Sequence, residues 1–345
     1  MDKAMLETFY EVLLNRVPNQ TEINDWGKLN LSTSDMLKAI VSSVEFIKNN
    51  NFSTNPNYNY LLEEYTGCTL DEIQLLTEYH KVNLPREGYV ADFIGTYTAV
   101  NYFHSLEGIS GTVENIPHIS NFHADVIEWV GLIKSVNRSK GTFNALELGS
   151  GWCPWLVASY TCAKMKGLKI GKLMGIEADT EHFEFGKQHF ESNDIPLLNV
   201  ELKEGIISVT NEPMYFPAID SNIDWGAKAI TETEFNNVDN KDSYIRKDSY
   251  TLDDLIKLFT DKIDLCHIDI QGDEFKIVKN AIDVLNENVK FMIIGTHSRQ
   301  IEDDLMNLLI SEKWILENEK ACKSTSGSNI GLLKDGTQLW LNSRH

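Results

Sequence analysis

From residue 143 to its end, the sequence alternates between short apolar runs and stretches with helical periodicity. The apolar runs have the length and composition of buried strands, and they are FNALEL (143–148), KLMGIEAD (172–179), IDLCHIDI (263–270) and VKFMIIGTH (289–297). Between them, apolar residues recur on one helical face, as in FKIVKNAIDVL. Strands that alternate with helices predict an α/β protein with a mostly parallel sheet. The last two apolar runs, WILENE and GTQLWLN, have no helix between them and predict a closing antiparallel hairpin.

The sequence before this region predicts a small helical unit and a linker. One apolar helical face is formed by Leu6, Phe9, Tyr10, Leu13 and Leu14. An asparagine-rich stretch has few side chains to bury and predicts a linker. Mixed helical patterning with many aromatic residues follows, and we expect a helical lid or substrate region there. The predicted divisions are residues 1–50 (helical module), 51–59 (linker), 60–142 (lid) and 143–345 (α/β core).

Composition and charge exclude several classes of protein. Lys and Arg number 31 against 51 Asp and Glu, which leaves a net charge of −20. Nucleic-acid backbones require a basic surface, so nucleic acid is not an expected partner. No apolar run reaches the roughly 18–20 residues of a membrane span. The five cysteines include no CxxC pair, which argues against a structural zinc site or a disulfide framework. We therefore expect a cytoplasmic protein.

The stretch ELGSGWCP follows the first strand of the α/β region and has the features of a ligand-binding turn. Gly149 and Gly151 allow a tight turn, and Glu177 ends the next strand, where an acidic residue can bind ribose hydroxyls. Glu147 would repel a pyrophosphate but attract the cationic groups of S-adenosylmethionine. Pro154 also departs from a dinucleotide fingerprint. The turn thus favours S-adenosylmethionine over a nicotinamide cofactor, and a purely structural turn is the other interpretation.

The segment 250–285 carries a family resemblance. It contains TLDDL at 251–255, followed by Asp264, Leu265, Ile268, Asp269, Gly272 and Glu274. With LELGSG, GIEAD and the terminal hairpin, this pattern resembles the FkbM family of methyltransferases over about residues 140–342. The resemblance implies a Rossmann-like class I methyltransferase sheet and S-adenosylmethionine as cofactor. It also implies methyl transfer to an oxygen, often a sugar hydroxyl of a surface glycan or a natural product.

The chain departs from the family pattern at three places. Gln271 stands where Glu is usual, and His267 stands where Lys is common. At the end of the apolar run VKFMIIGTH, the sequence reads GTHSR where many members have an acidic residue and then His. These changes leave the cofactor assignment intact but affect the expected catalytic groups. They keep open a second interpretation, a catalytically silent methyltransferase fold that serves as a scaffold.

The N-terminal segment carries a separate resemblance. FYEVLLNRVPNQTEINDW, with SSVEF further on, resembles a short three-helix module attached to bacterial glycosyltransferases, methyltransferases and surface proteins. This match covers roughly residues 5–48. It implies assembly or docking, so we expect a homo-oligomer or docking to glycan-assembly enzymes.

Candidate binding residues fall into two sets. The expected S-adenosylmethionine site consists of Glu147, Gly149, Ser150, Gly151, Trp152, Glu177, Ala178, Glu204, Gly205 and Asp269. The candidates for contact with a carbohydrate acceptor are Tyr215, Trp225, His104, His118 and Arg299. Tyr215 and Trp225 lie in an insertion and can stack on a sugar ring, although both can equally anchor a loop.

The candidate catalytic groups are Asp269 and His297. Asp269 lies at the end of the predicted strand IDLCHIDI, and His297 follows the predicted strand VKFMIIGT. The family resemblance implies that these two strands are adjacent, and adjacent strands lie about 4.8 Å apart. We expect His297 to be the general base and Asp269 to orient it, the acceptor, or both. The rival interpretation is that Asp269 and His297, with Glu274, hold Mg²⁺ or Mn²⁺. A third is that His297 only caps the following helix.

Overall fold

The computed structural model describes residues 3–14, 16–28, 39–40, 43, 62–114, 120–325 and 331–345. The chain divides into two compact units, Met1–Ile133 and Lys134–His345, which we call the N-terminal and C-terminal units. In the described part of the chain, no helix has both the length and the apolar character needed to cross a membrane.

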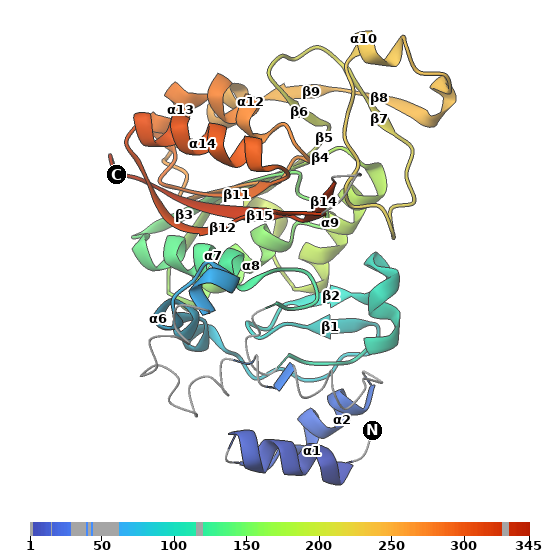
Figure 1. Ribbon diagram of the computed structural model, residues 1–345, viewed down its shortest axis with the longest axis vertical. Helices are drawn as coiled ribbons and strands as arrows, with labels where there is room; N and C mark the ends of the chain where they lie inside the picture. Colours follow the sequence, from blue (N-terminus) through green and yellow to red (C-terminus); the bar gives the residue numbers. More distant parts are fainter. Residues whose placement is uncertain are drawn as a thin grey trace. The chain divides into compact units, whose positions relative to one another are not determined.

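The C-terminal unit is built on a seven-stranded sheet of order β12-β15-β11-β10-β3-β4-β5 (Figure 1). The strands are β3 (Thr142–Leu148), β4 (Lys169–Glu177), β5 (Val200–Glu204), β10 (Leu265–Ile268), β11 (Phe291–Thr296), β12 (Trp314–Lys320) and β15 (Gly336–Asn342). β15 runs antiparallel to both β11 and β12, whereas the pairs among the other strands are parallel. The predicted α/β class with a closing antiparallel hairpin is therefore confirmed.

Helices cover both faces of this sheet, which explains why its inner strands are mostly apolar. Figure 1 shows α12, α13 and α14 on one face and α8 on the other. The helices of this part of the chain are α7 (Val126–Arg138), α8 (Pro154–Met165), α9 (Thr180–Ser192), α11 (Leu252–Ile256), α12 (Glu274–Asn280), α13 (Ile282–Asn288) and α14 (Arg299–Ser311). Every residue of β10 and β11 is buried, as in other sheets covered on both sides. The central core includes Leu148, Ile176, Ile268, Ile294 and Trp340.

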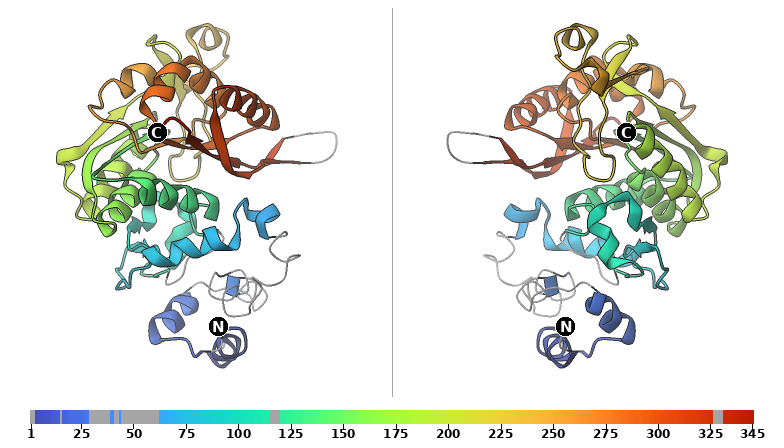
Figure 2. Two further views of the ribbon diagram at one scale, coloured as in Figure 1. Left: turned by 90° about the vertical axis from the view of Figure 1, so that its left-hand side faces the viewer. Right: turned by 90° about the vertical axis from the view of Figure 1, so that its right-hand side faces the viewer.

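An insertion separates β5 from β10. β6 (Ile206–Ser208) pairs with β9 (Ser249–Thr251), and between them β7 (Met214–Pro217) and β8 (Tyr244–Lys247) form an antiparallel hairpin with α10 (Glu232–Phe235). Near the chain end, β13 (Lys323–Ser324) pairs with β14 (Leu332–Lys334), and this pair projects from the sheet (Figure 2).

The N-terminal unit begins with helices that bury the predicted apolar face. α1 (Lys3–Phe9), the π-helical turn η1 (Tyr10–Leu14) and α2 (Gln20–Lys28) enclose a cluster of Leu6, Tyr10, Leu14 and Ile40. The predicted linker 51–59 lies outside the described residues, and the domain limits given above stay a prediction.

The rest of the N-terminal unit is largely made of short elements. They are α6 (Leu70–Gln74), η3 (Leu75–Tyr79), β1 (Tyr89–Ala91), β2 (Tyr97–Ala99), η4 (Val100–Tyr102) and η5 (His104–Ile109). β1 and β2 form a small antiparallel sheet, which the helical periodicity of this segment does not predict.

Candidate functional site

The register of the parallel strands brings four strand ends to one edge of the sheet. Ile268 of β10 lies opposite Leu148 of β3 on one side and Ile294 of β11 on the other, and Leu148 also lies opposite Ile176 of β4. The residues that follow these positions therefore share one carboxyl edge, where ligands of such sheets bind.

The glycine turn after β3 packs directly against the end of β10. Gly149 has φ +70°, and a Cβ at this position would lie 1.8 Å from the carbonyl oxygen of Asp269. The amides of Gly149 and Ser150 donate to the carbonyl of Ile176, at 3.0 and 2.9 Å. The turn is thus fixed between the ends of β4 and β10, and Asp269 is placed beside it.

The two predicted acidic residues of the turn bind main-chain amides. Glu147 accepts from Trp155 N at 3.2 Å and Leu156 N at 3.0 Å, in the first turn of α8. Glu177 accepts from Gly151 N at 2.7 Å and Asp179 N at 2.8 Å. Burial is the main cause that raises the pKa of both carboxyls. Glu177 therefore connects the glycine turn to the end of β4.

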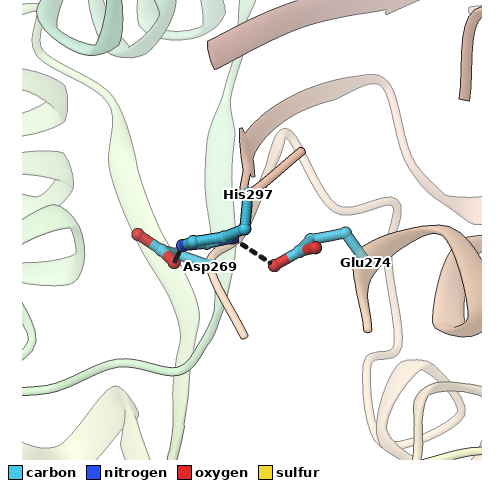
Figure 3. Close-up of side chains that lie close together, drawn as sticks. All are labelled: Asp269, Glu274 and His297. Carbon is cyan, nitrogen blue, oxygen red and sulfur yellow. Dashed lines mark hydrogen bonds and ion pairs between the residues drawn. The ribbon is translucent and has the colours of Figure 1, made fainter. Parts of the chain in front are cut away.

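His297 lies between two carboxylates (Figure 3). Its Nδ1 donates to Oε1 of Glu274 at 2.8 Å, and its Nε2 lies 3.4 Å from Oδ1 of Asp269. Glu274 is fully buried in the first turn of α12, and the same oxygen accepts from Gly272 N at 2.9 Å. Asp269 also accepts from the side-chain amide of Gln271 at 3.2 Å. A Glu at position 271, usual in the family that the chain resembles, could not donate when ionised.

The carboxylates determine the charge state of this histidine. Burial lowers the pKa of His297, but the hydrogen bond to Glu274 and the charge of Asp269 outweigh burial and raise the pKa to about 9. Unliganded His297 is therefore protonated at neutral pH.

A third carboxylate, which sequence reasoning missed, lies near the same histidine. Oδ1 of Asp335 is 3.9 Å from Nε2 of His297. The reason is the register of the C-terminal strand, because Thr296 of β11 pairs with Gly336 of β15. Knowledge of this antiparallel pairing would have identified Asp335, because the pairing places Asp335 beside His297.

Trp225, from the insertion, lies against the glycine turn. Its ring stacks on His182 with centroids 3.7 Å apart and meets the edge of Trp152 at 4.9 Å. A Cβ at Gly151 would lie 3.3 Å from the Trp225 ring. His182, which the sequence analysis did not select, also lies with its Nε2 2.7 Å from the carbonyl of Ser221. The insertion is thus held over the turn.

The other predicted residues have partners elsewhere in the C-terminal unit. Tyr215 stacks on Phe235 at 3.7 Å inside the insertion. Glu204 ends β5 and forms an ion pair with Lys247, while Arg299 donates to Glu302 at 2.9 Å.

The remaining predicted positions differ in how far the structure describes them. Ser150 is buried in the turn, Ala178 follows β4, and the amide of Gly205 donates to the carbonyl of Glu177 at 2.7 Å. His104 belongs to the N-terminal unit and lies 2.9 Å from Glu107, and His118 lies outside the described residues.

Comparison with known proteins points to methyl transfer. Residues 149–313 match the methyltransferase FkbM domain. A protein of Jannaschia sp. (strain CCS1), named "Putative methyltransferase", is 34% identical over 247 residues, which are 70% of this chain and 88% of that protein.

Two solved structures are similar at lower identity. The precorrin-6y C5,15-methyltransferase of Geobacter metallireducens GS-15 is 10% identical, covers 64% of this chain and 89% of its own, and has a TM-score of 0.35. The human methyltransferase 10 domain containing protein is 11% identical, covers 63% and 80%, and has a TM-score of 0.35.

Proposed function

Because the chain belongs to the FkbM family of methyltransferases, we propose that it methylates an oxygen, and that the acceptor is a sugar hydroxyl of a surface glycan or its precursor. The observation that carries the proposal is the 3.4 Å between Nε2 of His297 and Oδ1 of Asp269, together with the packing of the Asp269 carbonyl against Gly149 of the glycine turn. Support for a sugar comes from the family resemblance in the sequence, and a non-carbohydrate natural product is the alternative acceptor.

The methyltransferase fold implies S-adenosylmethionine, which supplies an electrophilic methyl group when bound. The residues of the turn fit such a ligand. Positions 149 and 151 carry no side chain, and residues 147–153 include a carboxylate but no basic group. A cationic ligand suits this composition better than a pyrophosphate does. Glu147 would hold the turn and α8 in place, and Gly149, Gly151 and Glu177 would contact the ligand.

The hydroxyl acceptor must lose a proton, and we infer that His297 takes it. Glu274 occupies Nδ1, so only Nε2 faces the sheet edge where Asp269 lies. With a pKa of about 9, roughly one imidazole in a hundred is neutral at pH 7. The same high pKa makes the neutral form a strong base. Asp269 then stabilises the imidazolium that forms, and it can also accept from the acceptor hydroxyl.

A divalent cation is the second candidate for activating the hydroxyl. One ligand atom each from Asp269, Glu274 and His297 lies within 4.8 Å of the others. Glu274 on Nδ1 also matches the outer partner that metal-bound histidines commonly have. Mg²⁺ or Mn²⁺ held by Asp269 and Nε2 of His297 would lower the hydroxyl's pKa. Activity that disappears with a chelator and returns with either ion would favour the cation over the base.

Two measurements test the proposal in sequence. Titration with S-adenosylhomocysteine tests the donor site, and failure to bind at millimolar ligand would favour the scaffold interpretation. Transfer of a labelled methyl group from S-adenosylmethionine to a panel of glycans and sugar nucleotides then tests the acceptor. A product whose methyl group is attached to nitrogen or carbon would contradict the proposal.

A further inference from the structure

The N-terminal unit contains a cavity that methyl transfer does not use. Its volume is about 300 Å³, which lies at the lower end of the range for small-molecule sites. Side chains of η1 and α2 line it, together with Ala39, Ile40 and Ser43 and with residues from the segments 90–114 and 120–122. Most of its wall is apolar or aromatic, including Tyr10, Trp26 and Val113.

Asp25 supplies a hydrogen-bond acceptor inside this cavity. The residue is 6% exposed, and its Oδ2 accepts from Val113 N at 3.1 Å. Its Oδ1 is buried and accepts no hydrogen bond. The nearest cation, Lys28, is 3.8 Å from Oδ1 and donates instead to the carbonyl of Gly111 at 2.7 Å. A buried acceptor without a donor is costly, so a ligand that donates to Oδ1 would be stabilised.

Burial raises the pKa of Asp25 to about 6. The carboxylate is therefore ionised at neutral pH although it is buried, and it is a strong acceptor for a ligand hydrogen.

The charges around the cavity limit the class of ligand. Its ionisable wall residues are Glu22, Asp25 and Glu114, and the described wall includes no Lys, Arg or His. This composition disfavours phosphates and carboxylates. Glu22 forms an ion pair with Arg16 at 2.6 Å, and Lys28 lies near Asp25. These two cations already offset the negative charge of the wall, so a cationic ligand is not needed to balance it. A neutral ligand that donates hydroxyl hydrogens fits best.

The aromatic residues give the cavity a flat surface. The indole nitrogen of Trp26 donates to the hydroxyl of Tyr10 at 2.8 Å, which fixes both rings. The Arg16 guanidinium lies over the Tyr10 ring, 4.9 Å from its centroid. Trp26 is only partly buried, and its ring offers an apolar surface beside the acceptor of Asp25. A pyranose has this combination of features, with an apolar C–H face and hydroxyls at its rim.

We propose that the N-terminal unit carries a non-catalytic binding site for one neutral hexose unit, with Asp25 as hydroxyl acceptor and Trp26 as the surface that the ring packs on. The site is independent of the methyl acceptor proposed above. It would give the enzyme a second contact with a glycan.

The test uses the full-length protein and three probes, the methyl glycosides of glucose, galactose and mannose. Binding is measured by ligand-observed NMR and by tryptophan fluorescence. We expect at least one glycoside to bind with a dissociation constant on the order of millimolar. Asp25→Asn keeps the shape of the side chain but replaces one carboxylate oxygen by an amide NH₂ group, which donates instead of accepting. It should weaken glycoside binding tenfold or more. Trp26→Leu should weaken binding similarly.

The controls separate this site from the catalytic one. Asp71→Asn, an exposed acid of the same unit, should bind the glycoside as the wild type does. All variants should bind S-adenosylhomocysteine unchanged, which reports an intact C-terminal unit. The proposal is overturned if no glycoside binds the wild type when its concentration is about 100-fold above the expected dissociation constant. It is also overturned if both cavity variants bind the glycoside as the wild type does. A third contrary result concerns tetramethylammonium, which tests whether the cavity prefers a cation: this ion would displace the glycoside at a concentration below the dissociation constant of the glycoside.

Discussion

Oε1 of Glu274 lies 2.8 Å from Nδ1 of His297, and Nε2 of the same ring points toward Asp269. Glu274 is fully buried at the start of α12, so the ring is oriented from the protein interior. One ring nitrogen is thereby bound to a buried carboxylate, and the proposed chemistry uses the other nitrogen. The following predictions depend on this division.

Removing the base should stop turnover and leave donor binding intact. His297→Ala is expected to lower kcat by about 10²-fold or more, while the affinity for S-adenosylhomocysteine stays unchanged. His80→Ala, at an exposed position, is the matched control and should behave as wild type. Near-normal turnover in His297→Ala would refute both the base and the cation role.

Neutralising Glu274 should move the pH profile. Glu274→Gln removes a negative charge that raises the pKa of His297, so this pKa falls toward its ordinary value. Because the proposed base is the neutral imidazole, the rising limb of kcat against pH should shift to lower pH. The measurement is a pH–rate profile of wild type and variant. A limb that stays in place would show that His297 does not set it.

The raised pKa of His297 also determines whether the stability of the fold rises or falls with pH. His297 titrates at about 9 in the folded chain and near 6.5 when unfolded, so its contribution is fully present below about 6.5 and is lost as pH rises through 9. We expect the free energy of unfolding to fall by on the order of 2–3 kcal/mol across this window. Denaturant titrations with EDTA present measure it, and His297→Gln should abolish this part of the dependence. An equal fall in the variant would contradict the assignment.

A methyl group at Gly149 should destroy the turn. Gly149→Ala combines a left-handed backbone with a Cβ at 1.8 Å from the Asp269 carbonyl, which is main chain and cannot rotate away. We expect loss of S-adenosylhomocysteine binding and a marked fall in thermal stability. Gly141→Ala is the control, because φ is +76° there but nothing lies within 4 Å of the added Cβ. It should cost only about 1–2 kcal/mol. Equal effects of the two substitutions would exclude the steric explanation.

Sequence reasoning reached the fold class from local patterns, and it reached the pairing of Asp269 with His297 from the strand order that the family resemblance implies. Apolar runs identify strands, and adjacent parallel strands present their last residues together. The 3.4 Å between Nε2 and Oδ1 is the expected consequence. The catalytic roles of the two residues remain predictions.

The hydrophobic pattern of the sequence predicts neither the direction of individual side chains nor the register of the strands. The pattern identifies Glu147 and Glu177 as candidate cofactor residues, but it does not predict that their oxygens accept hydrogen bonds from the amides of Leu156 and Gly151. Asp335 reaches His297 only through the pairing of β15 with β11. The hydrophobic pattern of β15 identifies a strand but not which neighbour it joins.

The position of β15 between β11 and β12 has a consequence for biosynthesis. β15 follows β12 along the chain but lies inside the sheet, so the facing edges of β11 and β12 stay unpaired until residues 336–342 have been synthesised. Asp335 arrives with the same segment. A nascent chain therefore cannot complete either the sheet or the surroundings of His297 before residues 335–342 have left the ribosome.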